Sequence, residues 1–140
     1  MTTRIASIVI LLALSLAVTA QSAEKTFSKS FNTDGKGTIN LDLPGAIDLK
    51  VWDNPSIRIG ITVSIPSGNG SMLGELANIG RYNLVSKSEG DVLTIQAPNM
   101  QKRITLKGEE FRETLTFVVF VPKDLTIEMP NAQAFADNRK

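Results

Sequence analysis

The chain has 140 residues, with 15 lysine and arginine side chains against 14 aspartate and glutamate side chains, and it contains neither cysteine nor histidine. This balance of charge argues against nucleic-acid binding, which needs a clustered excess of basic side chains. The usual zinc ligands and the usual bases for serine or cysteine nucleophiles are missing, so we expect no enzyme, no metal and no cofactor.

The N-terminus has the pattern of a secretory signal peptide. Arg4 is followed by an uncharged apolar run over residues 5–18 and by small residues up to Ala20. The apolar run is shorter than the roughly 20 residues that span a bilayer, so an uncleaved anchor is the weaker alternative. We expect residues 1–20 to be removed, with Ala23 as the alternative cleavage site, and the mature chain to be periplasmic or secreted without a membrane anchor.

Apolar and polar residues then alternate with period two over most of residues 27–129, which predicts strands with one buried face. The apolar positions of the first three strands are Ile39, Leu41 and Leu43, then Ile47, Leu49 and Val51, then Ile57, Ile59, Ile61, Val63 and Ile65. Pro44 and Gly45 separate the first two strands. A two-residue hairpin there would place Leu41 opposite Asp48, so we expect a three-residue loop or a corner between two sheets.

The connection over residues 66–81 contains the one segment with helical spacing of apolar residues, 71–79. Its glycines, residues 68–74, superficially imitate a dinucleotide-binding loop. The spacing G-x-G-x-x-x-G departs from that fingerprint and no second βαβ unit accompanies it, so a surface connection is favoured.

A hairpin is predicted over residues 81–97, with a two-residue turn at Glu89 and Gly90. This register pairs Tyr82 with Ala97, Leu84 with Ile95 and Ser86 with Leu93, and it places Tyr82 at the rim of the core.

Residues 117–121 are apolar on both faces, which is typical of a central strand covered on both sides. A loop at residues 122–124 would return the last strand onto this one. The expected pairs are Val121 with Leu125, Val119 with Ile127 and Phe117 with Met129.

Two groups of side chains are candidates for chemistry or binding. Glu109, Glu110 and Glu113 could serve as a glycosidase acid and base or bind calcium, but a solvated turn is favoured, with Glu113 at the core rim beside Lys102 or Arg103. Trp52 stands on the polar side of its strand. It is either a carbohydrate or protein contact or, as we favour, packed under the 66–81 connection or in a second sheet.

The order of these segments resembles the bacterial adhesin-like family of exported β proteins. The resemblance rests on residues 40–51 with their Pro-Gly turn, on the alternating strand 56–65, on the hairpin 82–96, and on residues 119–128, where V-P-K precedes a short Leu-Thr-Ile-Glu strand. It implies a non-enzymatic envelope or secreted domain without catalytic residues. In longer relatives the last strand opens a β-solenoid, so the chain resembles the head of such a protein.

We therefore predict a single all-β domain over residues 21–130, either an antiparallel two-layer sandwich or the capping part of a solenoid, with one short helix near 71–79 and a polar tail at 131–140. The expected function is non-catalytic interaction or structural support at the cell envelope, with a protein or glycan partner. A partner strand could add to the terminal edge strand. The expected contact residues are Trp52, Leu125, Ile127 and Met129. Alternatives are a carrier with an apolar cavity between the sheets and a carboxylate-dependent glycan hydrolase.

Overall fold

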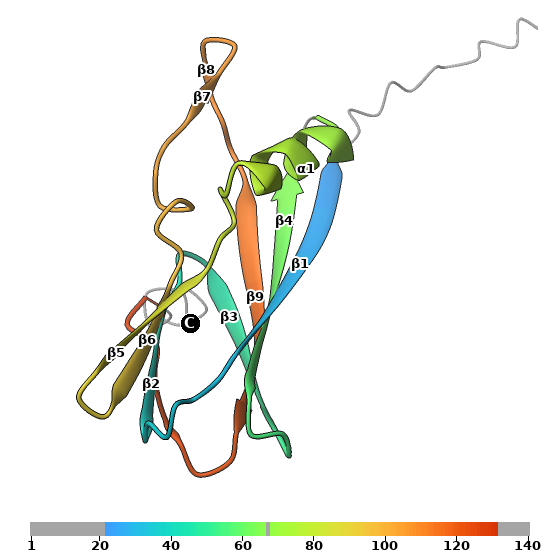
Figure 1. The fold of residues 1–140 in the computed structure, drawn as a ribbon. Helices are drawn as coiled ribbons and strands as arrows, with labels where there is room; N and C mark the ends of the chain where they lie inside the picture. The colour runs from blue at the N-terminus through green and yellow to red at the C-terminus, as the bar shows by residue number, and fades with distance from the viewer. Residues whose placement is uncertain (1–21, 67, 132–140) are drawn as a thin grey trace, which may run out of the picture.

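The computed structural model describes residues 22–66 and 68–131, which form two four-stranded sheets, a small hairpin and one helix (Figure 1). The all-β fold with one short helix is thus confirmed. The predicted signal peptide and most of the predicted tail lie outside the described residues. No helix in the described part of the chain is long and apolar enough to cross a membrane.

The first sheet has the strand order β1-β4-β9-β3, formed by β1 (Ala23–Phe31), β4 (Ile57–Ile65), β9 (Thr114–Pro122) and β3 (Ala46–Trp52). β4 pairs antiparallel with β1 and β9, whereas β3 runs parallel to β9. The long apolar strand β9 is therefore central, as predicted.

The second sheet has the order β10-β2-β6-β5, formed by β10 (Thr126–Glu128), β2 (Thr38–Asp42), β6 (Val92–Gln96) and β5 (Val85–Glu89). β2 is parallel to both β10 and β6, and only β5 and β6 are antiparallel. The prediction of wholly antiparallel sheets is wrong. Parallel neighbours arise because the chain crosses between the sheets after β2 and again after β9.

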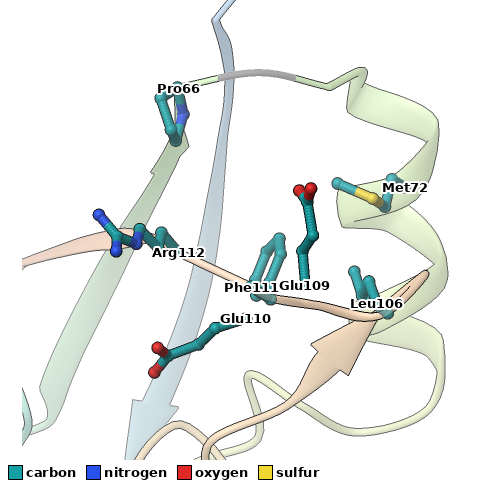
Figure 2. A pocket seen from close by; sticks show the side chains of 7 residues that line it. All are labelled: Pro66, Met72, Leu106, Glu109, Glu110, Phe111 and Arg112. Carbon is teal, nitrogen blue, oxygen red and sulfur yellow. The ribbon is translucent and has the colours of Figure 1, made fainter.

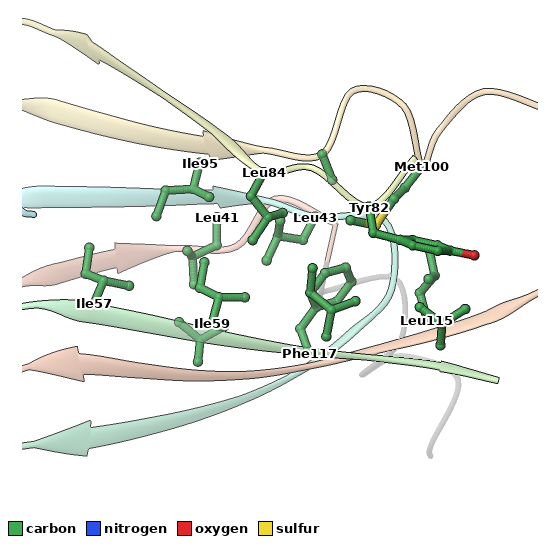
Figure 3. Close-up of a cluster of buried hydrophobic side chains, with 14 of the residues drawn as sticks. Leu41, Leu43, Ile57, Ile59, Tyr82, Leu84, Ile95, Met100, Leu115 and Phe117 are labelled. Atoms are coloured by element: carbon green, nitrogen blue, oxygen red, sulfur yellow. The ribbon is translucent and has the colours of Figure 1, made fainter. Parts of the chain in front are cut away.

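The core is a continuous cluster of side chains between the two sheets (Figure 3). It follows the predicted alternation, since every second residue of β4 is at most 2% exposed. Leu41 of β2 lies over Ile59 of β4, and Leu43, just after β2, lies near Phe117 of β9; all four are buried. The apolar positions predicted for β2 and β4 are all buried, but Val51 of β3 is 61% exposed.

Pro44 and Gly45 form a corner between the sheets, because β2 belongs to the second sheet and β3 to the first. This confirms one of the two predicted alternatives and excludes the hairpin. Gly45 is buried, and a Cβ atom there would overlap the carbonyl oxygen of Leu115 and lie 3.1 Å from the Phe117 ring. The corner therefore has space only for glycine at this position.

The β5-β6 hairpin turns at Gly90 and Asp91, one residue later than predicted. Ser86 pairs with Ile95 and not with Leu93, and Tyr82 precedes the strand instead of pairing within it. Gly90 has a φ of 58°, which suits the first central position of a type II′ turn. The shift moves each pairing by two residues and so leaves every side chain on its predicted face.

The predicted return of the last strand onto β9 is wrong. After Pro122 the chain crosses to the other sheet, where Ile127 of β10 is opposite Ile39 of β2. Asp124, with a φ of 68°, makes the turn that permits this crossing. β9 is also not covered on both sides, because Val118 and Phe120 on its outer face stay partly exposed to solvent.

The helix α1 (Gly70–Asn78) lies in the predicted segment. The Asn69 side chain caps its N-terminus by accepting a hydrogen bond from the Met72 N–H. Leu73 and Leu76 are buried, whereas Ile79, which we expected on the same face, is 79% exposed at the C-cap.

Residues 101–112 connect β6 of the second sheet to β9 of the first as a projecting arm, whose end is the hairpin of β7 (Thr105–Leu106) and β8 (Glu109–Glu110) (Figure 1). Lys107 and Gly108 both have positive φ and form its tip.

Candidate functional site

Three features of the described residues can bind or react: a side of the sandwich with two free strand edges, a buried polar cluster, and a cleft under the arm. The first contains the residues that the sequence pointed to. β3 is an edge strand of the first sheet and β10 is an edge strand of the second. The chain reaches β3 by crossing from β2 of the second sheet, and it reaches β10 by crossing from β9 of the first. We call the free edges of β3 and β10 the open side.

The opposite edges, β1 and β5, are bridged by side chains. Lys29 of β1 donates a hydrogen bond to the Leu84 carbonyl at 2.8 Å, and the Phe27 ring stacks on Tyr82 at 5.2 Å. Half-buried apolar side chains border the open side and pack against the core cluster: Ile47, Leu49, Leu125, Ile127 and Met129. The three residues predicted on the last strand therefore pack against the core while their strand lies at a sheet edge.

The backbone of β10 presents its free groups at Ile127. Thr126 donates its N–H to the Gly37 carbonyl at 3.0 Å, on the β2 side. Successive N–H groups along a strand point to opposite sides, so the Ile127 N–H points away from β2 to the free edge. A partner strand would find its first hydrogen-bonding group there.

Trp52 lies at the end of β3, in register with Pro122. Its ring packs on Phe120 of the same sheet at 5.2 Å, and its indole N–H donates to the Ser56 carbonyl at 2.8 Å. The ring therefore packs on the outer face of its own sheet, and the favoured packing under the 66–81 connection or in a second sheet is wrong. The ring remains half-buried, at one end of the open side.

The buried polar cluster consists of Arg81, Tyr82 and Glu113. Arg81 and Glu113 form an ion pair in which the side chains are 7% and 6% exposed, and the Tyr82 hydroxyl donates to the other Glu113 oxygen at 2.8 Å. Arg81 also donates to the carbonyls of Asn99 and Lys102 at 2.8 and 3.0 Å. Burial raises the pKa of the Tyr82 hydroxyl far above its usual value, and the Glu113 carboxylate raises it further.

This cluster fixes the base of the arm, because it ties the start of the β5-β6 hairpin to both ends of residues 99–113. Sequence reasoning placed Glu113 at the core rim but paired it with Lys102 or Arg103, and it missed Arg81. The sequence did contain one signal for Arg81 as the partner, since it directly precedes Tyr82, which was also predicted at the rim of the core.

The three glutamates do not form one acidic site. Both oxygens of Glu113 are engaged in the cluster, while Glu109 and Glu110 lie on the exposed hairpin of the arm. No group of three or more aspartate and glutamate side chains suited to a metal ion occurs among the residues that the structure describes.

The cleft lies between α1 and the arm and has a volume of about 470 Å³ (Figure 2). Its lining residues are Pro66, Met72, Leu106, Glu109, Glu110, Phe111 and Arg112. It is outside the two sheets, and the space between the sheets is occupied by the side chains of the core. The carrier alternative had placed its cavity between the sheets, whereas this cleft lies outside them.

No protein-family model matches the chain, and no curated protein matches it. Solved structures do. A putative cell adhesion protein from Clostridium sporogenes is 10% identical with a TM-score of 0.39, over 76% of this chain and 45% of that chain. A putative adhesin from Parabacteroides merdae is 16% identical with a TM-score of 0.35, over 75% of this chain and 35% of that chain.

A putative lipid binding protein from Parabacteroides distasonis is 14% identical with a TM-score of 0.34, over 75% of this chain and 37% of that chain. The chain thus spans less than half the length of each of these proteins.

Proposed function

We propose that this chain is an exported, non-catalytic interaction domain of the cell envelope, and that its open side accepts a β-strand from a partner protein. The observation that carries the proposal is the free edge of β10, where the Ile127 N–H points away from the sheet. Strand addition uses such backbone groups for affinity and the neighbouring side chains for specificity.

The apolar side chains at the open side support this choice of edge. Ile47 and Leu49 of β3 and Ile127 of β10 are only half-buried, so a partner strand would complete their burial. β5, the other edge of the same sheet, differs because all five of its side chains are exposed. An added strand there would gain hydrogen bonds but little apolar contact.

A non-catalytic role agrees with the chemistry of the chain. Neither histidine nor cysteine occurs in the sequence, and the buried carboxylate of Glu113 is held by an arginine and a tyrosine. Export rests on the signal-peptide pattern of residues 1–20.

The test compares two substitutions at Ile127. Ile127→Ala and Ile127→Pro lose nearly the same apolar contact, but only proline removes the outward N–H. Proline at an edge position whose N–H faces solvent removes no hydrogen bond within the sheet. We would measure the fraction of purified protein that sediments with envelopes from the producing cells, after circular dichroism has shown that both variants are folded.

We expect Ile127→Ala to bind with modestly reduced affinity and Ile127→Pro to lose at least tenfold more. If Ile127→Pro binds as well as Ile127→Ala, the edge of β10 is not the binding site. Trp52 is the chain's one tryptophan, so its fluorescence reports whether the partner also covers the end of β3.

A further inference from the structure

The cleft under the arm has the size of a small-molecule site. Its volume of about 470 Å³ falls within the range of roughly 300–1,000 Å³ that is usual for ligand pockets. Met72 from α1 and Leu106 and Phe111 from the arm supply apolar walls (Figure 2). Met72 precedes Leu106 by 34 residues and Phe111 by 39, so the site exists only when the arm is held beside the helix.

The Phe111 side chain, which forms one wall of the cleft, is positioned by contacts with Arg81 and with the Ile104 backbone. The Arg81 guanidinium lies 5.8 Å from the centroid of the Phe111 ring, and Arg81 is fixed by its ion pair with Glu113. The Phe111 N–H also donates to the Ile104 carbonyl at 2.9 Å, across the arm. The buried cluster therefore positions one wall of the cleft before any ligand arrives.

Three charged side chains line the cleft: Glu109, Glu110 and Arg112. Figure 2 shows the Glu109 carboxylate between Pro66 and Met72, above the apolar walls, whereas the charged ends of Glu110 and Arg112 point away from that carboxylate. Among residues 22–66 and 68–131, Glu109 makes no hydrogen bond or ion pair, while Glu110 approaches Arg103 at 3.8 Å. A negative group above an apolar floor complements a cation attached to an apolar body.

We propose that the cleft binds a small organic cation, an ammonium carried on an apolar chain or ring. The cation lies against Glu109, and the apolar body lies against Met72, Leu106 and Phe111. An apolar anion would meet the Glu109 carboxylate and is disfavoured. This site is separate from the open side and does not depend on the proposed strand addition.

The methionines provide the readout. The chain has four, and three of them are in the described residues: Met72 in the cleft, Met100 in the core and Met129 beside β10. Methyl-labelled methionine in the purified protein gives one NMR signal for each. The probes are decyltrimethylammonium, decyl sulfate and decyl maltoside below their micellar concentrations, which share one apolar tail and differ in head-group charge.

We expect the ammonium probe to shift the Met72 signal saturably, with Met100 and Met129 unchanged, and to bind at least fivefold more tightly than the sulfate. Glu109→Gln should weaken the ammonium probe about fivefold and leave the maltoside unchanged. Glu89→Gln, on the exposed strand β5 outside the cleft, is the control and should bind like the unaltered protein. Glu109 and Glu89 are both exposed, so neither variant should affect folding.

Three results would overturn the inference: equal affinity for ammonium and sulfate, an equal effect of the two glutamine variants, or a Met72 signal that does not move. The Ile127→Pro variant should keep the full Met72 response. Loss of envelope binding with an intact Met72 response would affect only the strand-addition proposal, and the reverse result would affect only the cleft.

Discussion

Arg81 and Glu113, 32 residues apart, form an ion pair that is more than nine-tenths buried at the base of the arm. Removing one partner of such a pair leaves the other charge buried without a partner, which lowers the free energy of unfolding by about 3 kcal/mol. We predict that Glu113→Gln lowers the free energy of unfolding by about that amount in urea titrations. Glu110→Gln, on the exposed hairpin, should change it by less than about 0.5 kcal/mol. Equal effects of the two variants would contradict the assigned role of the pair.

Tyr82 is the chain's one tyrosine, so its ionisation can be followed alone by phenolate absorbance. In urea the hydroxyl should titrate near pH 10, whereas the folded protein should hold the proton to higher pH, because burial and Glu113 raise the pKa. The folded state then binds the proton more tightly. Its contribution to stability is complete below about pH 10 and is lost as the pH rises toward the folded-state pKa.

Tyr82→Phe keeps the ring that stacks on Phe27 but lacks the hydroxyl. It should cost about 1.5 kcal/mol at pH 7, since the lost hydrogen bond is to a charged acceptor. The difference in unfolding free energy between the two proteins should shrink above about pH 10. A constant difference up to pH 11 would show that the hydroxyl titrates normally in the folded state.

Gly45 at the corner between the sheets has no space for a side chain. Gly45→Ala places a methyl group against the Leu115 carbonyl and the Phe117 ring, so we predict a loss of about 2 kcal/mol in the free energy of unfolding. Gly70→Ala is the control, because a Cβ there meets nothing within 4 Å. It begins α1 and should be neutral or slightly stabilising. Differential scanning calorimetry should give a lower melting temperature for Gly45→Ala than for Gly70→Ala. Equal melting temperatures of the two variants would show that the corner has space for a side chain.

The sequence predicted the parts of the fold that local periodicity determines. The alternation in residues 57–65 identified β4 and its buried face, and helical spacing identified α1. Pairing was predicted less well. For the last strand, loop counting assumed that a chain leaving β9 returns along the same sheet, whereas the chain crosses to β2. Which of two sheets receives a strand depends on contacts distant in sequence, and alternation is the same in both cases.

The residues of the candidate site were also predicted only in part. The edge strand with Leu125, Ile127 and Met129 was predicted from its terminal position, although its neighbour was misassigned. The partner of Glu113 was not predictable, because Arg81, Lys102 and Arg103 are all cations at compatible distances along the chain. The cleft escaped notice because its apolar walls come from a helix and an arm that the sequence does not place side by side.

The central claim, that β10 carries a free edge for a partner strand, is tested most directly by residue-resolved amide hydrogen exchange. In the isolated protein Thr126, bonded to Gly37, should exchange slowly, and the next amide, Ile127, should exchange at nearly the rate of an unprotected amide. When the protein is bound to envelopes, the Ile127 amide should become protected as well. An Ile127 amide that is already as protected as Thr126 in the isolated protein would contradict the account.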